Sequence, residues 1–347
     1  MKLLVCAMEA SSNIHLKELK KYLSDDVELL GVFDKELGNP LYDLTALAIM
    51  GIVDALKKLR FFFKLRDELV ALAASCDKVL LMDSSGFNLP LAKKLRETYP
   101  DKEIIYYILP QAWAWKKGRV AKLEKYCTKL CSIIPFESEM YSDKNKITYV
   151  GHPLLDEIKD FKEDLSNTNK IAFMPGSRKT EITNLMPIFK ELIKKIPNKE
   201  YILIIPAKFD DDYIKKIYGD ISQFSISKNT HKTLQEAEYA FICSGTATLE
   251  AGLIGTPFTL SYIAKKLDFF IGRMFVKLNY VGLANIFFDK MGKTALHNEF
   301  LQNEVSVENL FLDYTNMDKK LFFDNSKILR DYLKNGSSRN VAEIIKN

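Results

Sequence analysis

Short apolar runs alternate with longer amphipathic segments along this chain, and this alternation is what most restricts its fold. Most runs are continuous stretches of valine, isoleucine and leucine, as expected for parallel strands covered on both faces. The segments between them show helical periodicity, and strand and helix in succession predict an α/β protein with parallel sheets. The runs occupy residues 2–7, 27–33, 78–82, 104–108, 130–134, 171–174, 201–205, 239–243 and 258–261.

The alternation pauses once, at the polar and turn-rich residues 157–170. A chain of 347 residues is longer than one hydrophobic core usually serves. We therefore predict two Rossmann-like, doubly wound domains, residues 1–160 and 161–324, that face a central cleft. Ligands of such sheets bind beyond the carboxyl ends of the strands.

Several function classes are disfavoured. The formal net charge of +5 is too small to indicate nucleic acid. The turn after the first run lacks the G-x-G-x-x-G spacing of a dinucleotide site. The acidic run 210–212 has no partner ligand at metal-binding spacing, so neither a metal nor a cofactor is expected. Apolar stretches are too short for a signal peptide or a membrane span, which predicts a cytoplasmic or peripheral protein.

One candidate phosphate site is the turn Ser244-Gly245-Thr246, between the run 239–243 and a helix. Backbone N–H groups and the dipole at such a helix start attract phosphate. Glu250, one turn into the helix, would take a pair of ribose hydroxyls. The alternative is that Ser244 simply caps the helix.

A second candidate is Gly176-Ser177-Arg178, which follows the run 171–174. Arg178 would neutralise a leaving diphosphate, because its guanidinium presents a fixed fork of donors. The alternative is a helix start capped by Ser177 or Thr180, with Arg178 in solvent.

The candidate general base is Asp83, which follows the run 78–82 and would take a proton from an acceptor hydroxyl. The alternative is an aspartate that serves only to form a turn. Glu9, after the first run, is a competing carboxylate at the same expected edge of the sheet.

Two basic amphipathic segments indicate an anionic membrane surface as partner. Residues 55–66 combine five cations with an apolar side too wide for one core-facing stripe, and residues 265–278 repeat the pattern. Packing against the core is the alternative for both. The membrane-facing residues expected in the first segment are Lys57, Lys58, Leu59, Arg60, Phe61, Phe62 and Phe63.

Several short motifs follow one another along nearly the whole chain. They are Met8-Glu9-Ala10-Ser11, Met50-Gly51-Ile52-Val53, Asp83 with Phe87-Asn88, Pro110 with Trp113-Ala114-Trp115-Lys116, Pro135-Phe136-Glu137, Gly151-His152-Pro153, Pro175-Gly176-Ser177-Arg178, Ser244-Gly245-Thr246-Ala247 with Leu249-Glu250, and Leu283-Ala284-Asn285. In this order they resemble the lipid-A-disaccharide synthase family. Two departures are Gly86 and Asn13, where the family usually has acidic residues.

The resemblance implies a GT-B fold, with a C-terminal helix at about 325–347 that packs back on the first domain. It implies an inverting, metal-independent transfer from UDP-2,3-diacylglucosamine to 2,3-diacylglucosamine 1-phosphate, with release of UDP, at the inner membrane of a Gram-negative bacterium. It adds Asn285 to the residues expected to bind the UDP-sugar, and it leaves room for a homodimer.

Other functions stay open on the residues alone. One is a different UDP-sugar enzyme on the same fold, either a transferase with a polyprenyl-linked acceptor or a UDP-sugar epimerase. Another is a non-catalytic membrane-bound nucleotide-sugar binder, which would not need Asp83.

Overall fold

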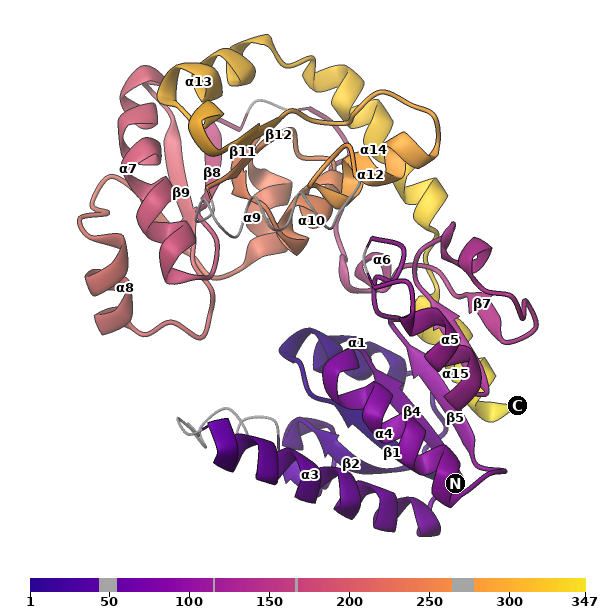
Figure 1. The fold of residues 1–347 in the computed structure, drawn as a ribbon. Coiled ribbons are helices and arrows are strands. Elements are labelled where there is room, and N and C mark those ends of the chain that lie inside the picture. Colours follow the sequence, from indigo (N-terminus) through magenta and orange to yellow (C-terminus); the bar gives the residue numbers. More distant parts are fainter. Residues whose placement is uncertain (44–54, 115, 166–167, 264–277) are drawn as a thin grey trace. The chain divides into compact units, whose positions relative to one another are not determined.

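The computed structural model describes residues 1–43, 55–114, 116–165, 168–263 and 278–347, without the side chains of 55–58. The chain forms two compact units (Figure 1). Unit 1 comprises Met1–Glu157 and Leu333–Asn347, and unit 2 comprises Ile158–Tyr332. Each unit is a parallel sheet with helices on its faces, which confirms the predicted doubly wound α/β class.

Unit 1 contains a seven-stranded parallel sheet in the order β3-β2-β1-β4-β5-β6-β7. The chain moves outward from β1 in one direction and from β4 in the other, so the topological switch point lies between these two paired strands. The strands are β1 (Lys2–Ala7), β2 (Glu28–Phe33), β3 (Tyr42–Asp43), β4 (Lys78–Met82), β5 (Glu103–Tyr107), β6 (Lys129–Ser132) and β7 (Ile147–Tyr149).

Helices cover both faces of the unit 1 sheet because alternate strand residues point to opposite sides. Leu4 and Cys6 pack with α3, α4 and α5, whereas Leu3 and Val5 pack with α1 and α15. The helices are α1 (Ala10–Lys20), α3 (Ala55–Leu72), α4 (Ser85–Thr98), α5 (Arg119–Tyr126), α6 (Leu154–Glu157) and α15 (Ser337–Lys346).

Unit 2 contains a six-stranded parallel sheet in the order β10-β9-β8-β11-β12-β13, with its switch point between β8 and β11. The strands are β8 (Lys170–Met174), β9 (Glu200–Ile204), β10 (Ser225–Ser227), β11 (Tyr239–Cys243), β12 (Phe258–Tyr262) and β13 (Glu299–Leu301).

One face of the unit 2 sheet carries an aromatic core. Phe173 and Phe241, on the paired strands β8 and β11, stack with ring centroids 5.3 Å apart, and α7, α8 and α13 pack over them. Helices α9 and α10 lie on the other side of this sheet (Figure 1). The helices are α7 (Lys179–Lys195), α8 (Asp211–Tyr218), α9 (Thr230–Glu236), α10 (Thr246–Ile254), α12 (Leu283–Lys290), α13 (Val307–Asn316) and α14 (Lys319–Leu333).

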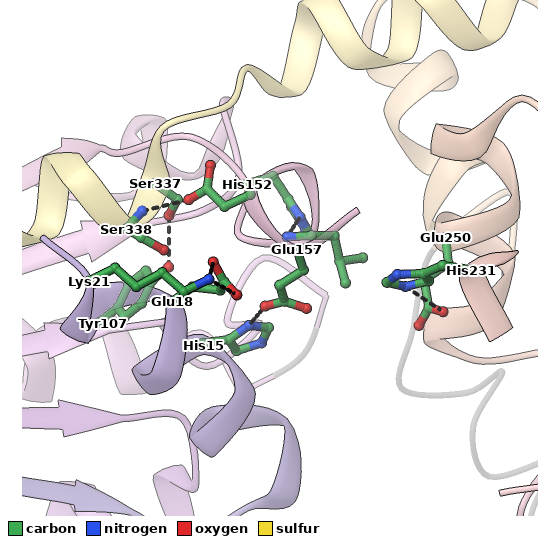
Figure 2. Close-up of polar contacts among 12 residues, drawn as sticks. His15, Glu18, Lys21, Tyr107, His152, Glu157, His231, Glu250, Ser337 and Ser338 are labelled. Carbon is green, nitrogen blue, oxygen red and sulfur yellow. Dashed lines mark hydrogen bonds and ion pairs between the residues drawn. The ribbon is translucent and has the colours of Figure 1, made fainter. Parts of the chain in front are cut away.

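The C-terminal segment differs from the single helix expected at about 325–347. It forms two helices, α14 and α15, separated by residues 334–336; Lys334, directly after α14, has a φ of 49°, a left-handed conformation that ends a helix, and Gly336, with a φ of 88°, precedes α15. The Asp156 carboxylate accepts the N–H groups of Gly336 and Ser338, at 2.6 and 2.7 Å. The Ser337 hydroxyl lies 2.8 Å from that of Tyr107 (Figure 2). These contacts hold α15 on unit 1.

Candidate active site

The two candidate carboxylates lie at the switch point of unit 1. Glu9 follows β1 and Asp83 follows β4, and these strands pair in parallel with Ala7 opposite Met82. The Ser84 hydroxyl donates a hydrogen bond to Glu9 Oε1 at 3.2 Å, which links the two turns. Both carboxylates therefore stand at the edge where doubly wound sheets bind ligands.

The turn that carries Asp83 is strained. Asp83 and Ser84 have φ angles of 49° and 39°, a left-handed conformation that costs a non-glycine residue about 1–2 kcal/mol. The Asp83 carbonyl accepts hydrogen bonds from the Tyr106 hydroxyl at 2.5 Å and from Asn88 Nδ2 at 3.0 Å. Sequence reasoning did not select Tyr106, because an aromatic residue in a buried strand looks like core.

Burial raises the pKa of the Asp83 carboxyl, and the negative charge of Glu9 adds to this effect, while a hydrogen bond from the Ser84 backbone opposes it. A carboxylate with a raised pKa is a stronger base once it is ionised. The surroundings of Asp83 therefore suit the removal of a proton from a hydroxyl.

Both carboxylates line a cavity of about 790 Å³ in unit 1. An apolar wall of the same cavity comes from α3 and α4, with Leu59, Phe62 and Phe87 among its residues. The cavity thus places a potential base beside a surface that would accept hydrocarbon.

Helix α3 divides the three consecutive phenylalanines between two environments. Phe61 and Phe62 are half-buried and pack against the core, and the Phe61 ring lies 5.7 Å from that of Tyr42. Phe63 and Leu59 remain 48 % and 52 % exposed. Arg60 is also exposed.

Four of the sequence expectations lie outside the described residues. They are the side chains of Lys57 and Lys58, the motif at 50–53, Trp115 of the Trp-Ala-Trp motif and the segment 265–277. Among the helices of the described residues, none has the length and apolar character needed to cross a bilayer.

In unit 2, both candidate phosphate turns follow the strands that flank the switch point. The turn Ser244–Gly245 leads from β11 into α10, which begins at Thr246. Within the described part of the chain no side chain caps this helix, so Ser244 does not serve as the cap, and Gly245 and Thr246 are exposed. The start of α10 therefore presents open N–H groups and a positive dipole to an anion.

The turn between β8 and α7 is arranged differently. Glu181, in the first turn of α7, accepts the backbone N–H groups of Ser177 and Arg178, both at 3.1 Å. Gly176 has a φ of 100°, and a Cβ there would lie 2.4 Å from Glu181 Oε2. Arg178 Nη1 donates to Glu181 at 2.8 Å, yet its side chain stays 78 % exposed. This turn therefore offers an anion the guanidinium rather than the backbone.

Glu250 lies on the first turns of α10 and has a partner that sequence reasoning missed. His231 Nε2, on α9, lies 3.4 Å from Glu250 Oε2 (Figure 2). The contact holds the glutamate side chain near the open start of α10. The two residues are 19 positions apart in the sequence, and no motif joins them.

Asn285 is fully buried and its amide is used within the protein. Nδ2 donates to His297 O and Glu299 Oε1, both at 2.9 Å, and Oδ1 accepts the N–H groups of Leu296 and His297. Glu299 in turn accepts the N–H of Gly282, just before α12. We therefore propose that Asn285 supports the start of α12 instead of touching the UDP-sugar.

A further carboxyl, Glu137, is buried beyond the end of β6, in the 3-10 helix Glu137–Met140. Ser132 Oγ donates to its Oε2 at 2.5 Å, while Oε1 finds no partner among the described residues. Burial raises the pKa of Glu137 to about 7. The adjacent Phe136 ring stands edge-on to Trp113, with centroids 5.4 Å apart.

Among the described residues, no group of three or more histidine, cysteine, aspartate or glutamate side chains is arranged to hold a metal ion.

A family model described as lipid-A-disaccharide synthetase matches residues 3–342. The lipid-A-disaccharide synthase of Helicobacter pylori strain G27 is 49% identical over 352 residues, a match that covers 98% of this chain and 96% of the relative. The synthase of Campylobacter jejuni strain RM1221 is 48% identical over 363 residues, covering 99% and 98%.

Solved structures show the same architecture at low identity. The UDP-GlcNAc 2-epimerase of Neisseria meningitidis, solved with UDP-GlcNAc bound, matches with a TM-score of 0.64 at 13% identity and 100% coverage of both chains. The calicheamicin glycosyltransferase matches with a TM-score of 0.60 at 11% identity, covering 99% of this chain and 97% of that one. These likenesses concern the fold alone, and they confirm the predicted two-domain α/β GT-B class.

Proposed function

The chain belongs to the lipid-A-disaccharide synthase family, and on that premise we propose that it joins UDP-2,3-diacylglucosamine to 2,3-diacylglucosamine 1-phosphate and releases UDP. The observation that carries this function is the 49% identity to a synthase of that name across 98% of the chain. The protein is accordingly a glycosyltransferase of lipid A synthesis.

We assign the acceptor chemistry to unit 1. A primary hydroxyl of the acceptor attacks C1 of the donor sugar from the face opposite the diphosphate, which inverts the anomeric centre. As the new C1–O bond forms, the hydroxyl proton passes to the Asp83 carboxylate. The raised pKa of Asp83 and the cavity beside it support this role. Glu9 keeps the site negative and is the second choice for the base.

We assign the donor to unit 2. As the bond from C1 to the diphosphate oxygen breaks, negative charge develops on the leaving UDP. The open start of α10, at Ser244–Thr246, and the exposed guanidinium of Arg178 supply positive potential for that charge. Glu250, held by His231, is suited to accept hydrogen bonds from the ribose hydroxyls.

We also propose that the protein is peripheral on an anionic inner-membrane surface. The exposed Leu59 and Phe63, beside the exposed Arg60 on α3, support this placement. Both proposed substrates carry acyl chains, so their reacting ends lie close to a bilayer. Apolar residues flanked by cations are the usual means of binding such an interface.

The test is product analysis by mass spectrometry, with purified protein and the two proposed substrates. Wild type should yield the acylated disaccharide phosphate and UDP. Asp83→Asn keeps the size of the side chain but removes the base, so turnover should fall by roughly 10²-fold or more. Asp101→Asn, at an exposed turn before β5, is the matched control and should stay active.

Donor binding should persist in Asp83→Asn, because the nucleotide contacts are assigned to unit 2. If wild type forms no disaccharide, the proposed reaction is wrong. An active Asp83→Asn together with an inactive Glu9→Gln would transfer the role of base to Glu9.

A further inference from the structure

The unit 1 cavity has three chemically distinct linings. Glu9 and Asp83 supply carboxylates, and apolar side chains of α3 and α4 form a wall. The third component is a single cation, Arg66 of α3, which is the only basic side chain among the described residues that line the cavity. The proposed reaction does not use this arginine.

Arg66 is held in place but keeps donors for a ligand. Its guanidinium lies over the Phe63 ring, 5.1 Å from the centroid, and its Nε and Nη2 donate to Asp67 Oδ1 at 2.9 and 2.7 Å. The Arg66 side chain is 25% exposed and that of Asp67 59%, so solvent screens this pair. A guanidinium has five N–H donors, and Asp67 uses one on Nε and one on Nη2.

The cavity is complementary to the proposed acceptor part by part. A carboxylate suits the attacking hydroxyl, and the apolar wall suits acyl chains. An arginine is suited to a phosphate group, because its planar fork can donate two parallel hydrogen bonds to phosphate oxygens. We propose that Arg66 binds the 1-phosphate of the acceptor and makes the enzyme selective for phosphorylated acceptors. This inference rests on the proposed function.

Arg66 would also fix the position of the acceptor. A phosphate held by α3 at one point of the cavity, with acyl chains against Phe62 and Phe87, leaves few orientations for the sugar between them. Orientation of the reacting hydroxyl toward Asp83 would follow from these two anchors. A dephosphorylated acceptor would keep only the apolar anchor.

The experiment compares two acceptors in detergent micelles at saturating donor, 2,3-diacylglucosamine 1-phosphate and the same lipid without its phosphate. Arg66→Ala should raise KM for the phosphorylated acceptor about tenfold or more, as expected for loss of a charged hydrogen-bonded contact. Its kcat/KM for the dephosphorylated acceptor should change less than about twofold. Arg66→Lys should retain part of the selectivity, since lysine keeps the charge without the fork.

Lys64→Ala is the matched control, because it removes the same charge from an exposed position of α3. It should leave the preference between the two acceptors unchanged. If Arg66→Ala loses kcat/KM equally on both acceptors, Arg66 only supports Phe63. If the variant keeps the full activity and acceptor preference of wild type, Arg66 does not bind the phosphate. Either result overturns the proposal.

Failure of the proposed function is visible separately, as absence of transfer by wild type on either acceptor. In that case, equilibrium binding of the two lipids without donor still decides the role of Arg66. Tighter binding of the phosphorylated lipid that disappears in Arg66→Ala supports it, and equal binding of both lipids by wild type refutes it.

Discussion

The buried carboxyl of Glu137 should make the stability of unit 1 depend on pH. Burial raises its pKa from the usual 4.5 to about 7, and the Ser132 hydroxyl, 2.5 Å from Oε2, only partly offsets this. In the unfolded chain the carboxyl ionises near its usual pKa. The folded state therefore binds a proton that the unfolded state releases, and stability falls as the pH rises from about 4.5 to about 7.

The size of the effect follows from the two pKa values. One pKa unit corresponds to about 1.4 kcal/mol, so the total loss above pH 7 is about 3 kcal/mol. At pH 5 slightly less than 1 kcal/mol of it has already been lost. Glu137→Gln removes the ionisation while keeping the shape. The variant's free energy of unfolding, relative to wild type, should therefore increase by roughly 2–3 kcal/mol between pH 5 and pH 8.

Tryptophan fluorescence during urea unfolding measures this change locally. The chain has two tryptophans, Trp113 and Trp115, and the Trp113 ring lies against Phe136, next to Glu137. The signal therefore reports unit 1 alone. The stability difference between variant and wild type is compared at two pH values, so any constant cost of burying the new amide cancels. Glu139→Gln, an exposed residue of the same 3-10 helix, is the control.

Two results would refute this reasoning. A Glu137→Gln effect of equal size at pH 5 and pH 8 would show that the carboxyl does not stay protonated in the fold. An equal pH dependence in Glu139→Gln would show that the effect is not specific to the buried site.

Three further expectations concern the active site and the membrane. Arg178→Ala should lower kcat/KM at least about 30-fold, the loss of one strong donor to the leaving group, without a change in Tm; near-normal turnover would remove Arg178 from the mechanism. The base must be ionised to act, so kcat/KM plotted against pH should rise through the raised pKa of Asp83. Glu9→Gln removes a negative charge that raises this pKa, so the rise should move to lower pH in that variant. An unmoved profile would contradict the coupling between the two carboxylates. Replacing Leu59 and Phe63 with serine should weaken binding to anionic vesicles roughly tenfold, whereas an equal pair of substitutions at exposed apolar residues of unit 2 should not.

The inner strands of both sheets were predictable because each is a continuous apolar run. The four missed strands are β3, β7, β10 and β13, which are the outermost strands of the two sheets. Each has only two or three residues, and most of these residues are partly exposed. Such strands form because a neighbouring strand offers hydrogen bonds, and their own composition gives little sign of it.

The order of the candidate residues along the chain predicted which strand each one follows, but not the geometry of the turns. Nothing in the sequence marks Asp83 and Ser84 for left-handed conformations, because glycine is the usual residue there. Nor could it show that Glu181 takes the N–H groups at the start of α7 while the start of α10 stays open. Such contacts depend on side-chain placement, and a motif does not record it.

The periodicity of α3 was also insufficient to separate core from surface. Three consecutive phenylalanines span most of a helical turn, so they cannot share one side of it. Only the neighbouring elements decide which of them is covered. Tyr42 lies against Phe61 and Phe87 against Phe62, while Phe63 stays exposed. Membrane binding is therefore best tested at Leu59 and Phe63, since serine at all three phenylalanines would also damage the core.

The docking of α15 on unit 1 has a consequence for synthesis on the ribosome. Unit 2 is one continuous stretch, Ile158–Tyr332, whereas unit 1 needs a helix that is translated after all of it. Until α15 emerges from the exit tunnel, Leu16 and Leu19 on α1 lack their partners Val341 and Ile345. Unit 1 therefore stays incomplete until the last helix of the chain has been made, although all its other elements are translated before unit 2.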